Sequence, residues 1–410
     1  MAPEFLITAP RVVPGAGEPA IFEPGYVLVA DGRVAEVAGG RPPRSPDRAL
    51  SGGYLVPGLI DLQVNGYFGV NLAEVEAVGW ARVARRLPET GATAFLPTFV
   101  TAPVAELADA LRHAAALAEQ PPAGARVLGV HLEGPFLAPG RAGAHRRDLI
   151  VPPSPATVAG LLTAGAGVLR VVTLAPEVVG GLAAVAALAS AGVVVSVGHS
   201  DATARQVAAA ADAGARMVTH LFNAQRPLHH REPGVVGQAL TDSRLTCGLI
   251  AEPSHVGPLA CVIAFAAAPG RICLVTDASA AAGMPPGRYR LGREPVEVRA
   301  DDDRAPRLAD GTLAGSVLGM DRAVANIVAA GVGLAEAVAA ATRVPADLIG
   351  RPDLGRLTPG AAADLAWLGD DLRARAAWMA GEQVYPLPTA RGAPCAGRPG
   401  PAGGSPADPR

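Results

Sequence analysis

Short apolar runs alternate along the chain with longer segments rich in alanine. The apolar runs recur at residues 59–64, 92–99, 127–132, 168–174, 193–197, 217–221, 246–251 and 272–276. Such runs are typical of buried β-strands, and the segments between most of them, such as 104–119 and 180–191, consist largely of good helix formers. Eight strands alternating with helices predict an α/β fold, a (β/α)8 TIM barrel rather than an open doubly wound sheet.

Both ends of the chain carry a different pattern, in which short β-type runs are separated by glycine and proline turns. Within residues 4–56, Asp31-Gly32 is a signal for a tight hairpin, and near the other end two β-type runs are joined at Ala380-Gly381. We expect residues 1–56 and 357–386 to meet in one small β domain, beside a barrel over residues 57–356. Residues 387–410 are rich in proline and glycine with almost no apolar bulk, which predicts a disordered tail.

Composition narrows the class of protein. Hydrophobic residues make up 50% of the 410 residues but aromatic residues only 4%, so the core must be aliphatic. The formal net charge is −2 and there is no basic run, which argues against nucleic acid as a partner. Glycine, proline and charged residues interrupt the apolar runs, which argues against a membrane span, and no signal peptide is evident. We therefore expect a cytoplasmic protein.

Two histidines follow apolar runs at matching positions. His199 and His220 each come two residues after a strand-like run, and an alanine-rich helical segment, residues 202–213, separates the two units. In a parallel α/β fold both imidazoles would lie at the C-terminal ends of consecutive strands, where ligands bind. A lone histidine is more often hydrogen-bonded inside a core. Two at matching positions favour a shared ligand, above all a metal ion.

Carboxylates stand at the ends of two other strand-like runs. Glu133 ends the third run and Asp277 follows the eighth, whereas His131 is expected to be a structural residue of the third strand. Helix capping could explain a single polar residue at such a place, but not imidazoles and carboxylates together. Glu133, His199 and His220 would leave one metal position open for water, as catalytic zinc requires. Asp277 is then the carboxylate that would handle the proton of that water.

Five segments resemble the N-acetylglucosamine-6-phosphate deacetylases of the amidohydrolase superfamily. They are VPGLID at 56–61, GVHLEGPF at 129–136, GHS at 198–200, THLFNA at 219–224 and LVTDA at 274–278. HLEGPF together with THLFNA is specific to the deacetylases, whereas PGLID marks only the superfamily. The resemblance covers about residue 20 to residue 386, and it implies a (β/α)8 barrel with a small β-sandwich built from both chain ends.

The resemblance also implies a metal site. Glu133, His199 and His220 would bind a divalent ion, with zinc expected first and iron or another divalent ion as alternatives. Many amidohydrolases hold a second metal with His-x-His after the first strand, but this chain has Gln63-Val64-Asn65 there. Neutral amides are poor zinc ligands beside imidazole. We therefore expect one tight ion, with Gln63 at most part of a weak or vestigial second site.

The reaction that the resemblance implies is deacetylation of N-acetylglucosamine 6-phosphate to glucosamine 6-phosphate and acetate. Water on the metal would be the nucleophile, with Asp277 as general base and then acid, and His145 would contact the acetyl carbonyl. The family further implies a homodimer, in which some substrate contacts come from the partner subunit. The substrate-binding residues would be Ala144, Asn223, Ala224, Arg231, His255, Leu313, Ala314 and Gly315.

One loop departs from the family pattern. After the seventh strand, Glu252-Pro253-Ser254-His255 stands where the family has Asp-Gly, a spacer and His. Proline removes a backbone donor and stiffens the loop, so two alternatives stay open. The metal site could serve a different N-acyl or cyclic amide substrate, or the barrel could bind a sugar phosphate without catalysis. Asp277 argues against the second alternative, because binding alone needs no carboxylate that activates water.

Overall fold

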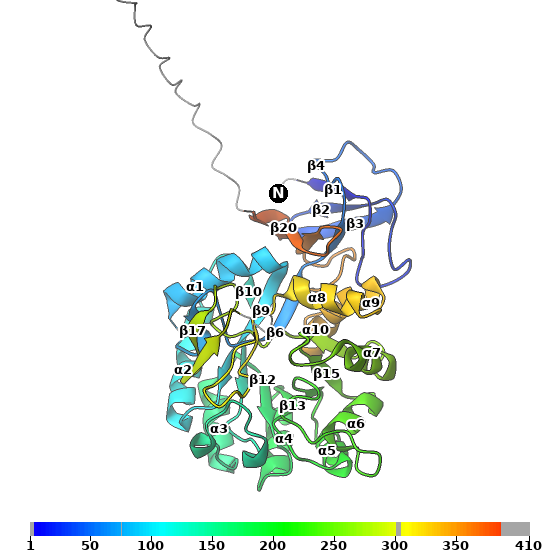
Figure 1. The fold of residues 1–410 in the computed structure, drawn as a ribbon. Helices are drawn as coiled ribbons and strands as arrows, with labels where there is room; N and C mark the ends of the chain where they lie inside the picture. The colour runs from blue at the N-terminus through cyan, green and yellow to red at the C-terminus, as the bar shows by residue number, and fades with distance from the viewer. Residues whose placement is uncertain (1–3, 75, 301–304, 387–410) are drawn as a thin grey trace, which may run out of the picture.

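A parallel β-barrel surrounded by helices forms the larger part of the protein (Figure 1). The structure is a computed structural model, and it describes residues 4–74, 76–300 and 305–386. Neighbouring strands of the barrel pair in parallel. In order around the barrel they are β6 (Leu59–Val64), β9 (Ala92–Val100), β11 (Val130–Glu133), β12 (Leu169–Leu174), β13 (Val194–Val197), β14 (Met217–Val218), β15 (Thr246–Leu249) and β16 (Ile272–Leu274). The predicted (β/α)8 barrel is confirmed.

The last strand returns to the first. The N–H of Asp277, just after β16, donates to the carbonyl of Gln63 on β6 over 2.9 Å, and Val64 and Ala278 form a parallel bridge. These contacts close the barrel at its C-terminal edge.

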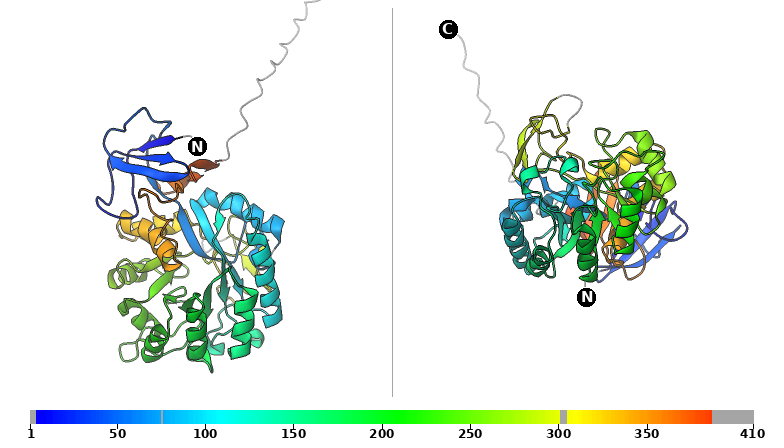
Figure 2. Two further views of the ribbon diagram at one scale, coloured as in Figure 1. Left: turned by 180° about the vertical axis from the view of Figure 1, so that it is seen from behind. Right: turned by 90° about the horizontal axis from the view of Figure 1, so that it is seen from below.

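Helices cover the outside of the barrel, as the views from behind and from below show (Figure 2). The helices described are α1 (Ala77–Arg86), α2 (Val104–Ala118), α3 (Pro155–Ala164), α4 (Gly181–Ser190), α5 (Ala204–Asp212), α6 (Gly234–Thr241), α7 (Pro258–Ala267), α8 (Met320–Ala329), α9 (Leu334–Ala340) and α10 (Arg343–Leu348). Their inner faces are apolar: α2, for example, buries Leu107, Leu111 and Ala114, which lie on one side at helical spacing.

Two small sheets lie beside the barrel, at the top of Figure 1. One has the order β3-β2-β1-β4 and the other β21-β20-β19-β5. Their strands are β1 (Phe5–Ala9), β2 (Gly25–Ala30), β3 (Arg33–Gly39), β4 (Arg48–Ala49), β5 (Tyr54–Pro57), β19 (Leu365–Leu368), β20 (Ala374–Met379) and β21 (Glu382–Tyr385). The second sheet thus joins β5, from the N-terminal part, to three strands from the C-terminal part.

A separate apolar cluster includes side chains from both sheets, among them Val27, Leu55 and Trp378. We therefore retain the proposal that residues 1–56 and 357–386 form one β-sandwich beside a barrel over 57–356. The tail expected at residues 387–410 lies outside the described residues.

Both predicted hairpin turns are present. Asp31 and Gly32 join β2 to β3 with φ of 50° and 72°, and Ala380 and Gly381 join β20 to β21 with φ of 48° and 81°. Two successive residues in the left-handed region match the right-handed twist of the paired strands. This explains why each turn ends in glycine.

Two segments differ from the prediction. Residues 127–132 do not form one strand, because Gly129 (φ 132°) separates β10 (Arg126–Val127) from β11. Residues 287–298, where the sequence pattern predicts no strand, form the hairpin of β17 (Gly287–Leu291) and β18 (Glu294–Val298). This hairpin buries Leu291 and Val296 in a small cluster of its own, which stabilises it despite the surrounding proline and glycine.

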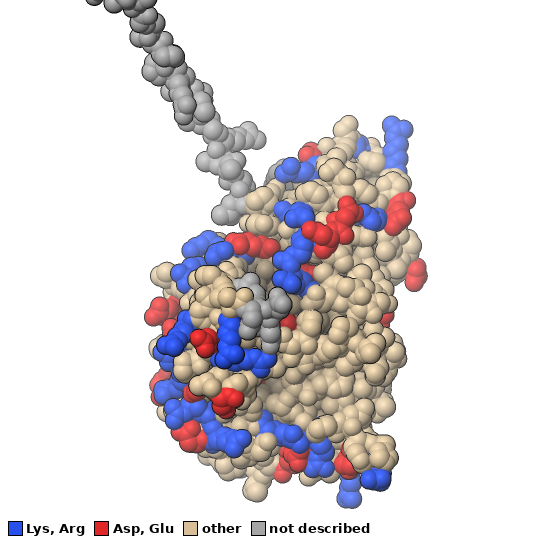
Figure 3. All heavy atoms as spheres, in the orientation of Figure 1, with Lys and Arg blue, Asp and Glu red and all other residues tan. Residues whose placement is uncertain are grey.

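The surface in Figure 3 carries basic and acidic side chains interspersed over the same face. Exposed ion pairs of the protein include Arg293–Glu106 and Arg146–Asp148. Within residues 4–74, 76–300 and 305–386, no helix has the length and apolar character that a membrane crossing requires.

Candidate active site

The loops at the C-terminal ends of the barrel strands surround a cavity of about 230 Å3. Parallel barrels bind ligands at this edge because the loops that follow the strands converge there. The sequence-predicted residues that line the cavity are Glu133, Ala144, His145, His199, His220, Asn223, Ala224, His255, Asp277, Leu313 and Gly315.

The backbone has a positive φ at three of these residues, each of which follows a barrel strand. His199, His220 and Asp277 follow β13, β14 and β16, with φ of 48°, 29° and 50°. Few residues with a side chain adopt this left-handed region, although histidine and aspartate tolerate it better than most. Such strain is common at functional sites, where the surrounding structure holds the residue in place.

Glu133, His199 and His220 converge on one point. The Nε2 atoms of the two histidines lie 3.0 Å apart, and Oε1 of Glu133 lies 3.4 Å from Nε2 of His199 and 3.1 Å from Nε2 of His220. Nδ1 of His199 contacts the carbonyl of Arg141 over 2.9 Å, and Nδ1 of His220 contacts the carbonyl of Asn223 over 3.1 Å. A carbonyl only accepts, so each Nδ1 carries a hydrogen, and a ring with that single hydrogen has the lone pair of Nε2 toward Glu133.

This arrangement requires a positive charge among the three acceptor atoms, either a proton or a metal cation. Burial acts to raise the pKa of Glu133, but its contacts with His199 and His220 outweigh burial and hold that pKa well below its usual range. Burial acts to lower the pKa of His220, but its hydrogen bond to Glu133 and the charge of Glu133 outweigh it, so that pKa is raised. Two imidazoles and a carboxylate are a ligand set that zinc accepts. Glu133, His199 and His220 could therefore hold a divalent cation.

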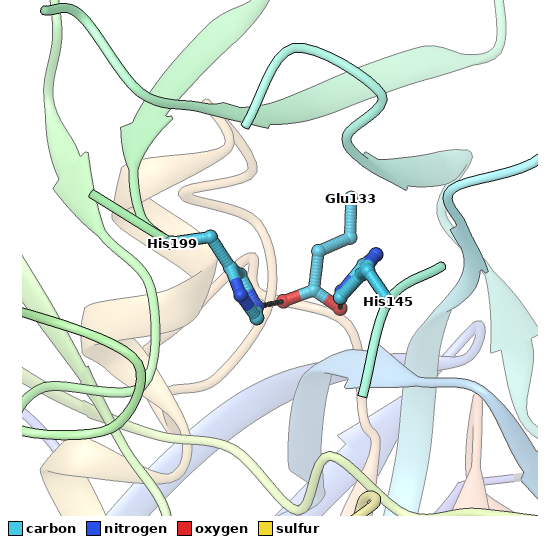
Figure 4. Close-up of side chains that lie close together, drawn as sticks. All are labelled: Glu133, His145 and His199. Carbon is cyan, nitrogen blue, oxygen red and sulfur yellow. Dashed lines mark ion pairs between the residues drawn. The ribbon is translucent and has the colours of Figure 1, made fainter. Parts of the chain in front are cut away.

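His145 also lies beside Glu133, and Figure 4 shows Glu133 between His145 and His199. Ligand atoms of these three residues lie within 4.8 Å of one another, with Nε2 of His145 3.8 Å from Oε2 of Glu133. However, the backbone N–H of Thr101 donates to Nδ1 of His145 over 3.3 Å, and the hydroxyl of Thr101, which can also donate, lies 2.8 Å from the same nitrogen. Because burial lowers the pKa of His145 to about 3, the ring is neutral and Nε2 carries the hydrogen. A donor at this position suits a carbonyl oxygen better than a cation, so the geometry favours His220 over His145 as the third ligand.

Asp277 is held beside this cluster by two side-chain amides. Its Oδ1 accepts hydrogen bonds from Nδ2 of Asn65 over 2.6 Å and from Nε2 of Gln63 over 3.1 Å. Nε2 of Gln63 also donates to Oε1 of Glu133 over 3.0 Å. Burial, followed by the charge of Glu133, raises the pKa of Asp277 to about 7. A carboxyl group with this pKa can take up and release a proton near neutral pH.

Two side-chain amide oxygens lie where many amidohydrolases hold a second metal. Both could accept a hydrogen bond from a further polar ligand. Among the residues described, Oε1 of Gln63 and Oδ1 of Asn65 are buried without a hydrogen-bond partner. Buried polar atoms of this kind usually bind water or another polar group. A weak second metal at Gln63 stays a prediction.

Two predicted substrate-binding residues lie away from the cavity of their own chain. Arg231 is on an exposed loop, where its Nη1 lies 3.0 Å from Nε2 of His230. Ala314 is fully buried and packs with Leu291 and Val296 under the hairpin. His131 is also outside the cavity: its two ring nitrogens contact the carbonyl of Leu62 and the hydroxyl of Thr173, in line with the structural role expected for it.

Three residues that contact site residues were missed by sequence reasoning. Thr101 contacts Nδ1 of His145, Asn65 contacts Asp277, and Glu252 contacts His255. Asn65 and Thr101 both directly follow strands, so their position was a usable signal. The contact of Glu252 depends on how its loop folds, which the sequence pattern does not specify.

Known proteins of the same family match almost the whole described chain. Residues 54–384 match the amidohydrolase family. The chain is 39% identical over 384 residues to the N-acetylglucosamine-6-phosphate deacetylase of Homo sapiens, covering 90% of this chain and 91% of that protein. It is 41% identical over 330 residues to an N-acetylgalactosamine-6-phosphate deacetylase of Escherichia coli, covering 80% and 87%.

Solved structures agree with these relatives. N-acetyl-D-glucosamine-6-phosphate deacetylase from Mycobacterium smegmatis superposes with a TM-score of 0.87 at 39% identity, over 93% of this chain and 100% of that chain. An aspartate-to-alanine mutant of the same enzyme has been solved in complex with N-acetyl-D-glucosamine-6-phosphate. An enamidase of the amidohydrolase superfamily, with 15% identity and a TM-score of 0.60, shares the fold. The chain belongs to the amidohydrolase family and, within it, to the N-acetylglucosamine-6-phosphate deacetylases.

Proposed function

We propose that the protein hydrolyses the N-acetyl amide of N-acetylglucosamine 6-phosphate to give glucosamine 6-phosphate and acetate. The observation that carries the proposal is the convergence of Glu133, His199 and His220, with Asp277 and His145 on the rim of the same cavity. Family membership adds the reaction type, because the relatives are named as deacetylases of amino sugar phosphates.

Glu133, His199 and His220 would hold one divalent ion, which we propose to be zinc. Such an ion would supply a Lewis acid that polarises the amide carbonyl and makes water a stronger acid. The proposal of a single ion is supported by Gln63, whose side-chain amide donates to both Glu133 and Asp277. An N–H group that points at these carboxylates occupies the side from which a second cation would approach them.

Asp277 would move the proton in this reaction. It would take a proton from the attacking water as the new C–O bond forms, and give it to the nitrogen as the C–N bond breaks. The N–H of His145 would donate to the carbonyl oxygen while negative charge develops there. One well-placed donor of this kind contributes about 3 kcal/mol to the stabilisation of a transition state.

The sugar phosphate would contact the cavity wall at Asn223, Ala224 and His255. The chain contains no lysine, so phosphate recognition must use arginine, histidine or backbone N–H groups. Arg231 is exposed and outside the cavity of its own chain. We therefore propose a homodimer in which Arg231 reaches the cavity of the partner subunit.

N-acetylgalactosamine 6-phosphate is a second candidate substrate, because one relative at 41% identity is an N-acetylgalactosamine-6-phosphate deacetylase. The two sugars differ only in the configuration of one hydroxyl group, so the same reaction centre would serve both. A cytoplasmic location stays our prediction from the sequence; the buried unpaired Cys247, Cys261 and Cys273 are in keeping with it.

The test is acetate release by the purified protein, with metal content measured on the same sample. We expect about one divalent ion per chain, and a higher kcat/KM for N-acetylglucosamine 6-phosphate than for its galactose epimer or for unphosphorylated N-acetylglucosamine. Equal kcat/KM with and without phosphate would favour a different N-acyl substrate. No acetate release from a sample loaded with metal would leave a protein that only binds the sugar phosphate.

A further inference from the structure

The loop after β15 places a hydrogen-bonded pair of side chains, His255 and Glu252, between two cavities. Nδ1 of His255 lies 2.8 Å from Oε2 of Glu252, and the side chains of His255 and Glu252 are only 4% and 12% exposed. His255 lines the reaction cavity, whereas Glu252 lines a separate cavity of about 600 Å3. The pair therefore forms part of the wall between the two cavities, and Glu252 itself does not line the reaction cavity.

The contact with Glu252 determines which ring nitrogen of His255 carries the hydrogen. A carboxylate only accepts hydrogen bonds, so Nδ1 of His255 carries the hydrogen and Nε2 is left for other partners. Among the described residues Nε2 has no hydrogen-bond partner, in keeping with a position at the cavity surface. The carbonyl of Glu252 also accepts from the N–H groups of His255 and Val256, both over 2.9 Å. One residue thus holds both the backbone and the ring of His255.

We infer that Glu252 is a positioning residue, which sets the orientation and tautomer of His255 so that Nε2 meets the sugar phosphate part of the substrate. The acyl part is already assigned to other groups in the proposed mechanism, because His145 would donate to the carbonyl oxygen and Asp277 would transfer the proton. The identity of the ligand rests on the proposed function. The tautomer of His255 does not rest on the proposed function, because it follows from the contact with Glu252 alone.

Kinetics separate positioning from a merely structural role. We expect Glu252→Gln to raise KM for N-acetylglucosamine 6-phosphate about tenfold, as the loss of a group that orients a binding residue commonly does, while kcat stays within about twofold. Glu252→Asp, which keeps the charge on a shorter side chain, should recover part of the loss. The matched control is Glu89→Gln, because Glu89 lines the same outer cavity and pairs with Arg86; it should leave KM unchanged.

A spectroscopic measurement tests the pair without using activity. Long-range 1H–15N correlation spectra report which ring nitrogen of a histidine is protonated, and a His255→Asn variant identifies the signals of His255 among the 8 histidines. The wild type should carry the hydrogen on Nδ1, and Glu252→Gln should yield a mixture of tautomers.

Several results would overturn the inference. They are a wild-type His255 protonated on Nε2 alone, a Glu252→Gln variant with unchanged KM and tautomer, and a joint loss of kcat, metal and thermal stability in that variant. If the wild type releases no acetate, the proposed function fails, whereas the spectra still decide whether Glu252 sets the state of His255.

Discussion

At the scale of single residues, the direction of hydrogen bonds distinguishes histidines that the sequence cannot tell apart. His199 and His220 face carbonyl oxygens with Nδ1, whereas His145 faces a backbone N–H. The first arrangement leaves an acceptor at Nε2, which a metal needs, and the second leaves a donor, which a carbonyl oxygen needs. The assignment of these roles therefore rests on the partner of the second ring nitrogen.

This distinction predicts different losses for two substitutions. His220→Asn should lose the metal, because it removes one of three ligands. His145→Asn should keep the metal and lower kcat by about 100-fold to 1,000-fold, as removal of an oxyanion donor does. Elemental analysis and kcat on the same two preparations check this. A His145 variant without metal, beside a His220 variant with full metal, would reverse the assignment.

Asp277 offers a second prediction at this scale. Asp277→Asn should bind metal normally and lose at least about 1,000-fold in kcat, since the amide cannot accept the proton of water. In the wild type, activity should rise with pH as Asp277 loses its proton. Burial and the charge of Glu133 raise its pKa to about 7, and a bound cation lowers it, so the rise should be complete at or below about pH 7. A variant with near-normal kcat at any pH would exclude Asp277 as the base.

At the scale of elements, the sequence predicted regular segments well and their interruptions poorly. The strand β6 matches the expected residues, and the helix α2 matches the expected range to within one residue, because each has a regular apolar pattern and a clear boundary. The break at Gly129 was missed, since it depends on the close approach of Arg170 from the next strand: a Cβ at Gly129 would lie 2.3 Å from Cγ of that residue. The hairpin of β17 and β18 was missed because its stability comes from tertiary packing of Leu291.

The same limit applies to the site. The sequence motifs identified Glu133, His199, His220 and Asp277, all of which line one cavity. They could not show that Thr101 contacts His145, because the position of Thr101 after β9 is a local signal but its pairing with a loop residue far along the chain is not.

The contact between β6 and β16 yields a prediction for stability. Asp61 is buried on β6 and accepts from the hydroxyl of Thr276 over 2.5 Å and from its N–H over 3.2 Å. Burial raises the pKa of Asp61 from 3.8 to about 6. Between these two values the folded protein binds more protons than the unfolded chain, so this residue makes the free energy of unfolding fall as pH rises through that window.

Asp61→Asn removes this titration. The stability of the variant relative to the wild type should therefore improve by up to about 3 kcal/mol between about pH 4 and pH 7. Chemical denaturation of both proteins at several pH values measures the difference. A constant difference across the window would mean that Asp61 is not titrating there.

At the scale of the whole molecule, the small sheets and the barrel are tied together both through the chain and through side chains. Only Gly58 separates β5 in the small sheet from β6 in the barrel. Asp364, just before β19, accepts from Nε and Nη2 of Arg126, both over 3.0 Å, and from the N–H of Ala380 over 2.9 Å. Because Arg126 begins β10, beside barrel strand β9, this carboxylate links the barrel to the hairpin of β20 and β21.

This link should stabilise the protein without contributing to catalysis. The side chain of Asp364 is 4% exposed and that of Arg126 is 37% exposed, so Asp364→Asn removes a largely buried charge partner and should cost about 1–3 kcal/mol of unfolding free energy. The matched control is Asp371→Asn, whose exposed pair with Arg375 should contribute much less to stability, because solvent screens it. Neither side chain lines the reaction cavity, so kcat of the folded protein should stay within about twofold in both variants.

Denaturation followed in parallel by circular dichroism and by acetate release tests this prediction. The two signals should be lost together, at a lower denaturant concentration for Asp364→Asn than for Asp371→Asn. If the two variants are equally stable, the pair at Asp364 does not hold the small sheets to the barrel, and continuity through Gly58 is the stronger tie.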